Sequence, residues 1–507
     1  MIWPLLMVAG VIVTLWLRWR LKNQKLIEMS RQFPGPNTLP VLGNALQFMC
    51  QPEELHKIIK GLITNHGDAL RFWLGPDLNF IISNPDDFKV LLTSMKTTVK
   101  GPQYKYMADV LGGGILSGSG PVWRKHRKIA NPNYGRRAIE SYNDTFNKEV
   151  DLLMEKFRLA PVGEMCNIYY DVVRTTSYAV CQTLMGLSKG QTMRLPYLHD
   201  IIDETPLYDI VFDRMTIWYL QIDPVFWLTP SYQRQKSFAK MITKFARSIL
   251  QHRIEKLNTL TEKYKVNLTD PDEDALGNTK LSVIDRFILS QELNNDELVK
   301  ETFTVFTSSQ EASAKISSCL LLMMAYHPEC QEKLYTEIKN VIGAKDRWVS
   351  DADLKMMPYL DMVFKEVLRL FPIGAMLQRT ISEDIDISLG TLPAGGSLVI
   401  PIFHIHRDPR FWTNPEAFDP ERFSPENSKL RHPNCYLPFS LGPMDCLGRY
   451  FGTKLIKTIC IRVLREFQLT STDTYKDLKL SIAISKIVHN SSFNIIETDV
   501  SGVHNYN

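Results

Sequence analysis

One cysteine in a glycine-containing segment constrains this chain of 507 residues more than any other feature. The segment reads Phe439-Ser-Leu-Gly442-Pro-Met-Asp-Cys446-Leu-Gly448, and a helical pattern begins directly after it. Apolar residues recur there at the spacing of one helix face: Tyr450, Phe451, Leu455, Ile459, Val463 and Phe467. We therefore expect Cys446 to lie just before a buried helix, where free backbone N–H groups and the helix dipole favour a thiolate.

A thiolate in this position suits one kind of ligand in particular. Gly442 and Gly448 let the backbone approach a flat molecule where a Cβ atom would collide. A single cysteine thiolate also serves as the axial ligand of haem iron in one class of haem proteins. Taken alone, the segment leaves an ordinary buried thiol open as the alternative.

Three further motifs accompany the cysteine segment. Glu366-Val-Leu-Arg369 has the form E-x-x-R, Pro420-Glu-Arg422-Phe423 has the form P-E-R-F, and Trp123-Arg-Lys-His-Arg127 has the form W-x-x-x-R. Together with F-x-x-G-x-x-x-C-x-G, and in this order, they resemble the cytochrome P-450 superfamily. The resemblance runs from about Phe33 to the C-terminus.

This resemblance implies a mainly α fold with small β-sheets, in one haem-binding catalytic domain over residues 46–507. It implies haem b as the cofactor, with Cys446 as the ligand of the iron. The other cofactor-binding residues that it implies are Trp123, Arg127 and Arg379 at the propionates and Phe439, Gly442 and Gly448 in the cysteine segment.

A buried ion network is expected to fix the segment that carries the cysteine. Glu366 and Arg369 lie one helical turn apart, and Arg422 can complete a three-way network with them. Within the cysteine segment the family usually has Arg or His two residues before the thiolate, at a propionate. Here that residue is Met444, so we expect somewhat weaker haem retention.

The stretch from Asn295 to Tyr326 is predicted to be the long helix over the distal face of the haem. The family usually carries [AG]-G-x-[DE]-T-[TS] there, whose acid and threonine pass protons during oxygen activation. The matching residues are Ser308-Ser309-Gln310-Glu311-Ala312-Ser313, so the acid is retained and the threonine is replaced by alanine. We assign Glu311, Ala312 and Ser313 to the catalytic site.

Several interpretations of Ala312 stay open. In the one we prefer, Ser313 or an ordered water replaces the threonine, and monooxygenation continues with poorer coupling. In the second, a hydroxyl of the substrate delivers the proton. In the third, the enzyme is an isomerase or dehydratase that rearranges a hydroperoxide or endoperoxide without NADPH. A catalytically idle haem protein is the last alternative.

The segment from Leu111 to Lys128 resembles the fourth family clan of insect cytochromes P-450. Many relatives in that clan attach haem covalently through a glutamate on the distal helix. The matching position is Ser308, so a covalent link is not expected. The resemblance implies a monooxygenase that inserts one oxygen atom from O₂ into a hydrophobic substrate, which is fatty acid-like, hormone-like or xenobiotic.

The N-terminus is predicted to be an uncleaved membrane anchor. Residues Ile2 to Leu17 are apolar apart from Thr14, and basic residues follow them. Sixteen helical residues span ~24 Å, short of the ~30 Å hydrocarbon core, and flanking tryptophans and arginines extend this reach. A cleaved signal peptide, the alternative, has its basic residues before the apolar stretch. We predict an anchor over residues 1–20 in the endoplasmic reticulum membrane, a basic and Pro-rich linker over residues 21–45, and a cytosolic catalytic domain.

Two segments near the expected pocket carry further predictions. Tyr104 to Gly120 is loop-like and is expected to roof the haem pocket. The aromatic-rich stretch from Tyr208 to Trp227 is interpreted either as an apolar lid that admits membrane-dissolved substrates or as ordinary core packing.

Charge and cysteine usage limit the partners. The net charge of +4 is too small to indicate nucleic acid binding. The eight cysteines show no pairing rhythm, which favours free thiols in a reducing compartment. No dinucleotide-binding fingerprint is present, so we expect electrons from a separate NADPH-cytochrome P-450 reductase, with cytochrome b5 as a second candidate donor. A basic docking face is predicted from Lys125, Lys128, Arg449 and Lys454.

Overall fold

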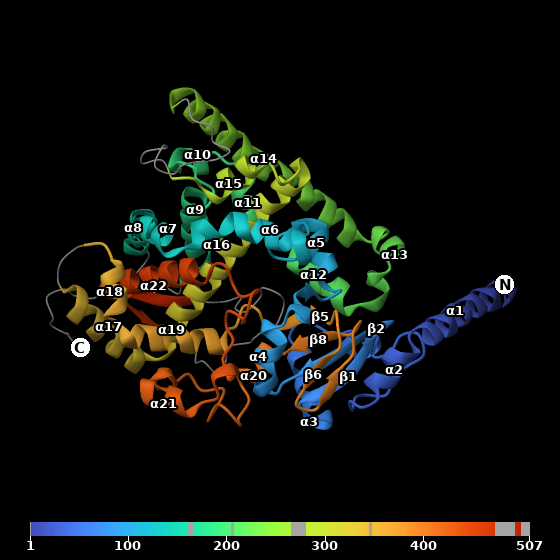
Figure 1. The fold of residues 1–507 in the computed structure, drawn as a ribbon. Helices are drawn as coiled ribbons and strands as arrows, with labels where there is room; N and C mark the ends of the chain where they lie inside the picture. Colours follow the sequence, from blue (N-terminus) through green and yellow to red (C-terminus); the bar gives the residue numbers. More distant parts are fainter. Residues whose placement is uncertain are drawn as a thin grey trace.

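The computed structural model describes residues 2–159, 166–203, 207–264, 280–343, 347–471 and 492–497. Helices dominate the described residues, and the strands form small sheets (Figure 1), which confirms the predicted fold class. The α-helices are α1 (Ile2–Lys22), α2 (Gln24–Ser30), α3 (Leu55–His66), α4 (Pro85–Thr93), α5 (Tyr104–Leu111), α6 (Gly120–Ala130), α7 (Arg136–Ser141), α8 (Asn143–Arg158), α9 (Tyr169–Thr183), α10 (Lys189–Met193), α11 (Leu198–Asp203), α12 (Leu207–Thr216), α13 (Asp223–Trp227), α14 (Pro230–Tyr264), α15 (Val283–Ser290), α16 (Asn295–Tyr326), α17 (Pro328–Ile342), α18 (Asp351–Lys355), α19 (Pro358–Leu370), α20 (Ile402–Ile405), α21 (Pro425–Leu430) and α22 (Arg449–Glu466). The strands are β1 (Ala69–Leu74), β2 (Asp77–Ile82), β3 (Val99–Lys100), β4 (Cys166–Asn167), β5 (Leu377–Thr380), β6 (Ile385–Ile387), β7 (Gly390–Leu392), β8 (Ser397–Ile400), β9 (Phe467–Thr470) and β10 (Ser492–Glu497).

The largest sheet has the strand order β1-β2-β8-β5-β3. β1 and β2 form an antiparallel hairpin in which Leu70 pairs with Ile81. β2 and β8 pair in parallel, although more than three hundred residues separate them, and β8 then pairs antiparallel with β5. This sheet brings the N-terminal part of the chain against the segment between the E-x-x-R helix and the cysteine.

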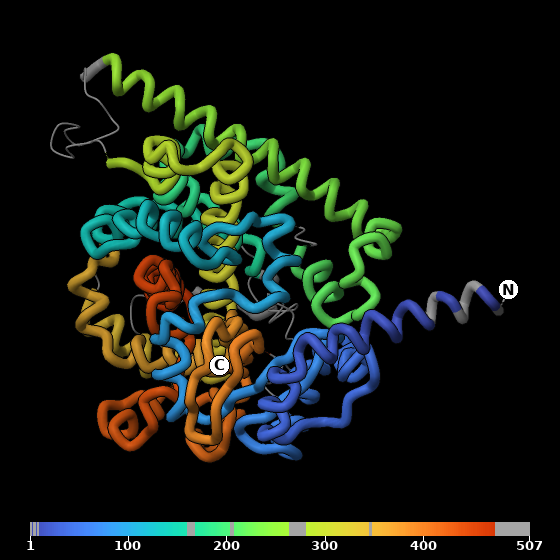
Figure 2. Tube along the Cα trace, turned by 45° about the vertical axis from the view of Figure 1, so that its right-hand side comes forward, coloured from blue at the N-terminus to red at the C-terminus, as the bar shows by residue number. Residues whose placement is uncertain are grey.

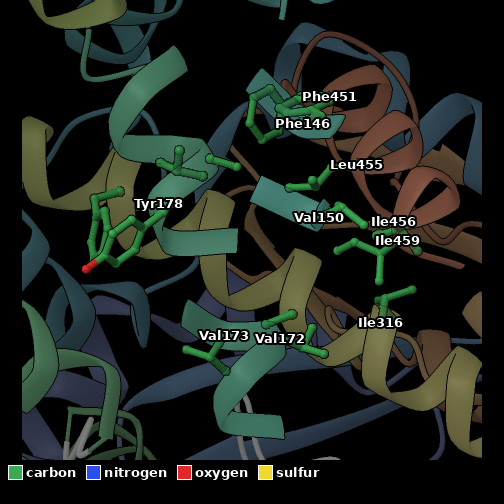
Figure 3. Close-up of a cluster of buried hydrophobic side chains, with 14 of the residues drawn as sticks. Phe146, Val150, Val172, Val173, Tyr178, Ile316, Phe451, Leu455, Ile456 and Ile459 are labelled. Carbon is green, nitrogen blue, oxygen red and sulfur yellow. The ribbon is translucent and has the colours of Figure 1, made fainter. Parts of the chain in front are cut away.

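Four helices form the centre of the main hydrophobic core. Side chains of α8, α9, α16 and α22 meet there, and Figure 3 shows Phe146, Val172, Ile316 and Leu455 converging from them. Removing such residues from water stabilises the fold by about 1.5–3 kcal/mol per large apolar side chain. The core therefore fixes α22, which follows the cysteine, against α16, the predicted distal helix.

α16 has the bounds predicted from the sequence, because both of its ends carry strong local signals. Asn294 caps the N-terminus, accepting a hydrogen bond from the Glu297 backbone N–H at 3.0 Å, while the Glu297 carboxylate accepts one from the Asn294 N–H at 2.8 Å. His327-Pro328 then ends the helix, because a proline ring disfavours helical geometry in the preceding residue.

The segment predicted as a loop from Tyr104 to Gly120 begins with a helix, so that prediction was wrong for its first half. α5 covers Tyr104–Leu111 and ends at Gly112, whose φ is +77°. Tyr106, Met107 and Leu111 are buried on one side of this helix. Glycines at 112, 113, 114, 118 and 120 suggested a loop for the whole segment, but within it only residues 112–119 lack helical structure.

The N-terminal helix α1 projects away from the body (Figures 1 and 2) and packs against it at one end, where the Trp19 and Trp73 rings lie 5.5 Å apart. Among the residues that the structure describes, no helix combines the length and hydropathy needed to cross a membrane.

The predicted linker packs onto the large sheet instead of spanning free space. Phe33 is 1% exposed and lies against Phe80 on β2, and the Pro34 carbonyl accepts a hydrogen bond from the Arg71 N–H at 2.8 Å. A bridge between Gly43 and Leu74 adds to this attachment. Residues 33–43 therefore belong to the folded body.

Candidate active site

The cysteine segment holds Cys446 at the N-terminus of α22. The Cys446 N–H donates to the Phe439 carbonyl at 2.9 Å, which closes the segment into a compact turn. Gly448 is the N-cap of α22, so Cys446 lies two residues before the N-cap and three before the first helical residue, Arg449. The Cys446 side chain is exposed, whereas Met444 and Phe451 on either side are buried. The cysteine thus has an accessible thiol on a rigid support.

Opposing effects act on the Cys446 thiol. The largest effect is desolvation, because protein atoms packed around the thiol displace water, and it raises the pKa of Cys446. The negative charge of Asp445 raises this pKa further. A hydrogen bond from the Gly448 backbone N–H and the charges of Arg127 and Arg449 lower the pKa. The net effect is a raised pKa, so the backbone N–H groups and charges that were expected to favour the thiolate do not outweigh burial. A metal ion, if bound, would supply the positive charge that favours the thiolate.

The two glycines of the segment, Gly442 and Gly448, lie in different surroundings. Gly442 has φ +79°, and a Cβ built on it would lie 2.1 Å from the Leu92 carbonyl oxygen. Gly442 is therefore required by packing against the end of α4, and the sequence interpretation of a ligand approach does not explain it. Around Gly448 only Cys446 Sγ comes within 4.0 Å of such a Cβ, so this side of the backbone is open.

The predicted propionate residues come from two elements. Trp123 and Arg127 lie one turn apart on α6, and Trp123 is 6% exposed. Arg127 donates to the Asp445 carbonyl at 2.7 Å and to its carboxylate at 2.8 Å, which joins α6 to the cysteine segment. Arg379 lies on β5, is 2% exposed, and donates to the Gln378 carbonyl at 3.0 Å.

One face of α16 stays accessible within an otherwise buried helix. From residue 301 to 325 all residues are buried except Ser308, Ser309, Ala312 and Lys315. Positions spaced by three, four and seven lie on one helix face. Ala312, at the position of the usual threonine, is at the centre of this face. The face is therefore the part of the distal helix that a ligand can reach.

Glu311 is held by two residues that the sequence analysis did not single out. Its carboxylate accepts a hydrogen bond from Lys315 Nζ at 2.6 Å. The buried Tyr208 of α12 lies beside it: burial raises the pKa of Tyr208, and the charge and a hydrogen bond of Glu311 raise it further. Lys315 follows Glu311 by one turn, a spacing that predicts an ion pair, whereas nothing in the sequence identifies Tyr208 as a partner.

Ser313 is a buried residue of α16, 3% exposed, and does not belong to its accessible face. Its hydroxyl donates to the Ser309 carbonyl of the same helix at 2.7 Å. Its Oγ is 3.7 Å from the Cβ position of Gly452, so the side chain faces α22. The replacement of the threonine by Ser313 stays a prediction.

The three residues of the predicted ion network do meet. Arg369 Nε and Nη2 donate to the Glu366 carboxylate at 2.7 and 2.8 Å, and both side chains are fully buried. Arg422 Nε lies 3.4 Å from the same carboxylate. Arg369 also donates to the carbonyls of His406 and Pro415, so the network fixes the chain that leads to the cysteine.

His406 connects this network to the cysteine segment. The Leu437 N–H donates to His406 Nε2 at 2.9 Å, and His406 Nδ1 lies 3.3 Å from the Arg369 carbonyl. Burial, together with the charge of Arg369, lowers the pKa of His406 to about 3. The imidazole is therefore neutral, with Nδ1 as donor and Nε2 as acceptor. Among the described residues, no group of three or more His, Cys, Asp or Glu side chains could hold a metal ion.

A separate cavity of about 500 Å³ lies between α3 and residues 401–416. Its lining includes Ile59, Phe403 and Arg407. None of the predicted site residues belongs to it.

The residues of the site fit an iron porphyrin. The donor set is one accessible thiol, and a second helix offers an accessible face with a small residue at its centre. The indole of Trp123 and the guanidinium groups of Arg127 and Arg379 are N–H donors suited to carboxylate oxygens. The fold and site together define a haem-thiolate protein.

Comparison with known proteins agrees with this class. The family model described as Cytochrome P450 matches residues 33–491. Cytochrome P450 4c3 of Drosophila melanogaster is 29% identical over 472 residues, covering 90% of this chain and 88% of that protein. Cytochrome P450 4V2 of Homo sapiens is 29% identical over 449 residues, covering 87% and 85%. Cytochrome P450 4c21 of Blattella germanica is 27% identical over 466 residues, covering 91% and 92%.

The chain belongs to the cytochrome P450 family, and its similarity to family 4 members of insects and vertebrates confirms the predicted resemblance. It is an oxidoreductase, a haem monooxygenase. Its cofactor is haem b with a cysteine thiolate ligand, and NADPH electrons reach it through a reductase.

Proposed function

We propose that this enzyme is membrane-bound and inserts one oxygen atom from O₂ into a fatty acid-like, hormone-like or xenobiotic substrate. The accessible Cys446 thiol, fixed between the Phe439 carbonyl and α22, is the observation that carries the proposal. Haem bound there supplies the oxygen chemistry, and the protein supplies position, a proton path and exclusion of water.

In this proposal the roles of the residues follow from their places. Cys446 ligates the iron. Trp123, Arg127 and Arg379 hold the propionates by N–H donation, and Arg127 at the same time orients the cysteine segment through Asp445.

Proton delivery is assigned to Glu311 with an ordered water in place of the threonine. Ala312 has no hydroxyl, and the Ser308 and Ser313 hydroxyls already donate to carbonyls of their own helix at 2.6 and 2.7 Å. Lys315 Nζ and Tyr208 hold the Glu311 carboxylate in place. We expect poorer coupling of NADPH consumption to product than a threonine permits.

The proposal places the enzyme on the endoplasmic reticulum membrane, with an anchor formed by the apolar part of α1. Exposed apolar side chains on and beside α13 support a second contact with lipid: Ile222 is 46% exposed, Trp227 53% and Leu228 89%. Of the stretch from Tyr208 to Trp227, Tyr208, Phe212 and Phe226 are buried, which agrees with core packing, and the exposed residues carry the proposal of an apolar lid. Flotation with liposomes tests both contacts, with the full chain, a variant lacking residues 2–22 and Trp227→Ala. Recovery of the truncated variant with the liposomes to the same extent as the full chain would exclude the anchor.

A reductase is proposed to dock near α6, with cytochrome b5 as a second candidate donor. Lys125 and Lys128 are exposed there, and Lys125 pairs with Glu292 at 2.6 Å on the surface. Lys454 was wrongly included in this face: it is 4% exposed, and its Nζ donates to Asp351 and to the Ile139 carbonyl.

Turnover with NADPH tests the proposed function. Membranes containing the enzyme and a reductase are given NADPH, O₂ and a panel of fatty acids and foreign compounds. We expect a substrate-dependent hydroxylated product. Rapid conversion of a hydroperoxide without NADPH, and no product from the panel, would instead identify the isomerase or dehydratase that Ala312 leaves as the second candidate.

A further inference from the structure

Glu301 is a buried carboxylate that has no role in the function proposed above. It lies on α16, is 1% exposed, and its Oε1 accepts a hydrogen bond from the Ile115 backbone N–H at 3.0 Å. Nδ1 of His126 on α6, itself 2% exposed, lies 3.2 Å from the same oxygen. One carboxylate oxygen therefore joins α16, α6 and the segment between α5 and α6.

That segment, residues 112–119, is here called the roof loop, and α16 holds it at two points. The Thr304 hydroxyl of α16 donates to the Leu111 carbonyl at 2.9 Å, just before the loop begins. The carboxylate described above holds the loop near its middle. Within the loop, the Gly118 N–H donates to the Gly114 carbonyl at 2.8 Å, which makes this part compact.

The roof loop lies at the end of the accessible face of α16. Glu301 precedes Ser308 by seven residues and Thr304 precedes it by four, so all three lie on the helix face that carries Ala312. The loop is bound where this face is covered, and one turn further along the helix the face becomes accessible at Ser308. The loop therefore borders the space from which a ligand reaches α16.

Gly114 shows how closely the roof loop fits the carboxylate. A Cβ built on Gly114 would lie 1.1 Å from Glu301 Oε1 and 2.8 Å from His126 Nδ1. A Cβ built on the preceding residue, Gly113, would have no neighbour within 4 Å. Of these two adjacent glycines, only Gly114 is required by the contact with Glu301.

The second oxygen of the carboxylate argues against a packing role for Glu301. Oε2 is buried, and no residue that the structure describes donates a hydrogen bond to it. A buried carboxylate that is only partly hydrogen-bonded lowers stability, and an apolar side chain of similar size avoids this loss. Packing alone therefore does not explain Glu301, whereas its hydrogen bond to the roof loop does.

We propose that Glu301 and His126 are positioning residues that set the roof loop beside the ligand space and so determine which ligands fit against α16. The half-buried apolar side chains of Ile115 and Leu116 are the groups that they place there. This inference rests on the proposed function, with haem bound at Cys446, and adds to it a determinant of substrate choice.

Hydrogen exchange of the purified, haem-loaded full chain tests the contact without any substrate. Glu301→Leu removes the acceptor and Gly114→Ala displaces it, so both should speed exchange of the Ile115 amide at least about tenfold. Glu301→Gln keeps a carbonyl oxygen for this N–H and is expected to stay within about threefold of wild type. Gly113→Ala is the matched control and is also expected to stay within about threefold.

Binding of two azoles to the haem iron, followed by the shift of the Soret band, tests the effect on the ligand space. Imidazole is small, whereas phenylimidazole carries a ring that needs room beside α16. The Kd of phenylimidazole should rise about tenfold in Glu301→Leu and Gly114→Ala, because the displaced loop no longer packs on this ring, and that of imidazole should stay within about twofold. Gly113→Ala should change neither constant.

Unchanged exchange of the Ile115 amide in both Glu301→Leu and Gly114→Ala would refute the contact. An unchanged ratio of the two azole constants would refute its effect on ligand choice, and so would an equal change of this ratio in Gly113→Ala. If Glu301→Leu does not fold, Gly114→Ala and Glu301→Gln decide the outcome. Neither readout needs turnover, so failure of the proposed function, seen as no hydroxylated product from wild type, is a separate result.

Discussion

Replacing Arg369 by methionine tests the ion network that supports the cysteine. Arg369 is fully buried and donates five hydrogen bonds. Two go to the Glu366 carboxylate, and three go to the carbonyls of His406, Pro415 and Ala417. Methionine keeps much of the volume and removes all five donors.

The expected cost follows from what is left behind. Glu366 is also fully buried, and a buried carboxylate without its partner costs about 3–5 kcal/mol. Each of the three carbonyls loses a hydrogen bond, which costs about 1 kcal/mol. The summed loss is comparable with the whole free energy of unfolding of a typical domain, about 5–15 kcal/mol. We therefore expect Arg369→Met to yield little folded protein and no Soret band.

Chemical unfolding, followed by haem absorbance and tryptophan fluorescence, measures this effect. The control is Arg136→Met, because Arg136 also pairs with a glutamate of its own helix, Glu140, at 2.8 Å, but both side chains are exposed. We expect this control to unfold at the same denaturant concentration as wild type, because exposed ion pairs contribute little. The double variant with Glu366→Gln should recover about 2 kcal/mol relative to Arg369→Met alone, because the stranded charge is gone. An Arg369→Met protein that binds haem and unfolds within about 1 kcal/mol of wild type would refute this reasoning.

Three further predictions concern pH, the lid and proton delivery. In the folded protein the pKa of His406 is lowered from 6.5 to about 3. The free energy of unfolding therefore has the full contribution of neutral His406 above about pH 6.5 and decreases by about 1.4 kcal/mol per pH unit as the pH falls toward 3. His406→Gln should flatten this decrease in urea unfolding. Arg214, 3% exposed, pairs with Asp109 of α5 at 2.8 Å and with Asp223 of α13. Arg214→Leu should therefore speed amide hydrogen exchange in both helices about tenfold and leave exchange in α22 unchanged. Unchanged exchange in α5 and α13 would show that these ion pairs do not hold the proposed lid. Ala312→Thr should raise the product formed per NADPH at least about twofold, and an unchanged ratio would show that a hydroxyl at this position does not limit coupling.

The elements that the sequence predicted well have local signals. α16 begins at a capping box and ends before His327-Pro328, so its bounds were readable. The cysteine position followed from a motif and from the apolar face of α22.

The elements that the sequence did not predict depend on tertiary neighbours. The direction of Ser313 toward α22 is set by how α16 is rotated in the core, which no local pattern fixes. Lys454 was expected at the surface because lysine usually is, but Asp351 and a carbonyl pair with it inside.

The reduced carbon-monoxide difference spectrum of wild type, Cys446→Ser and Cys435→Ser tests the central claim most directly. Cys435 is the control, because it is a buried cysteine near the same segment. The account predicts the thiolate-type Soret band, the signature of the family, in wild type and Cys435→Ser, and its loss in Cys446→Ser. The same band in Cys446→Ser, or its absence from a haem-loaded wild type, would contradict the assignment of Cys446 as the ligand of the iron.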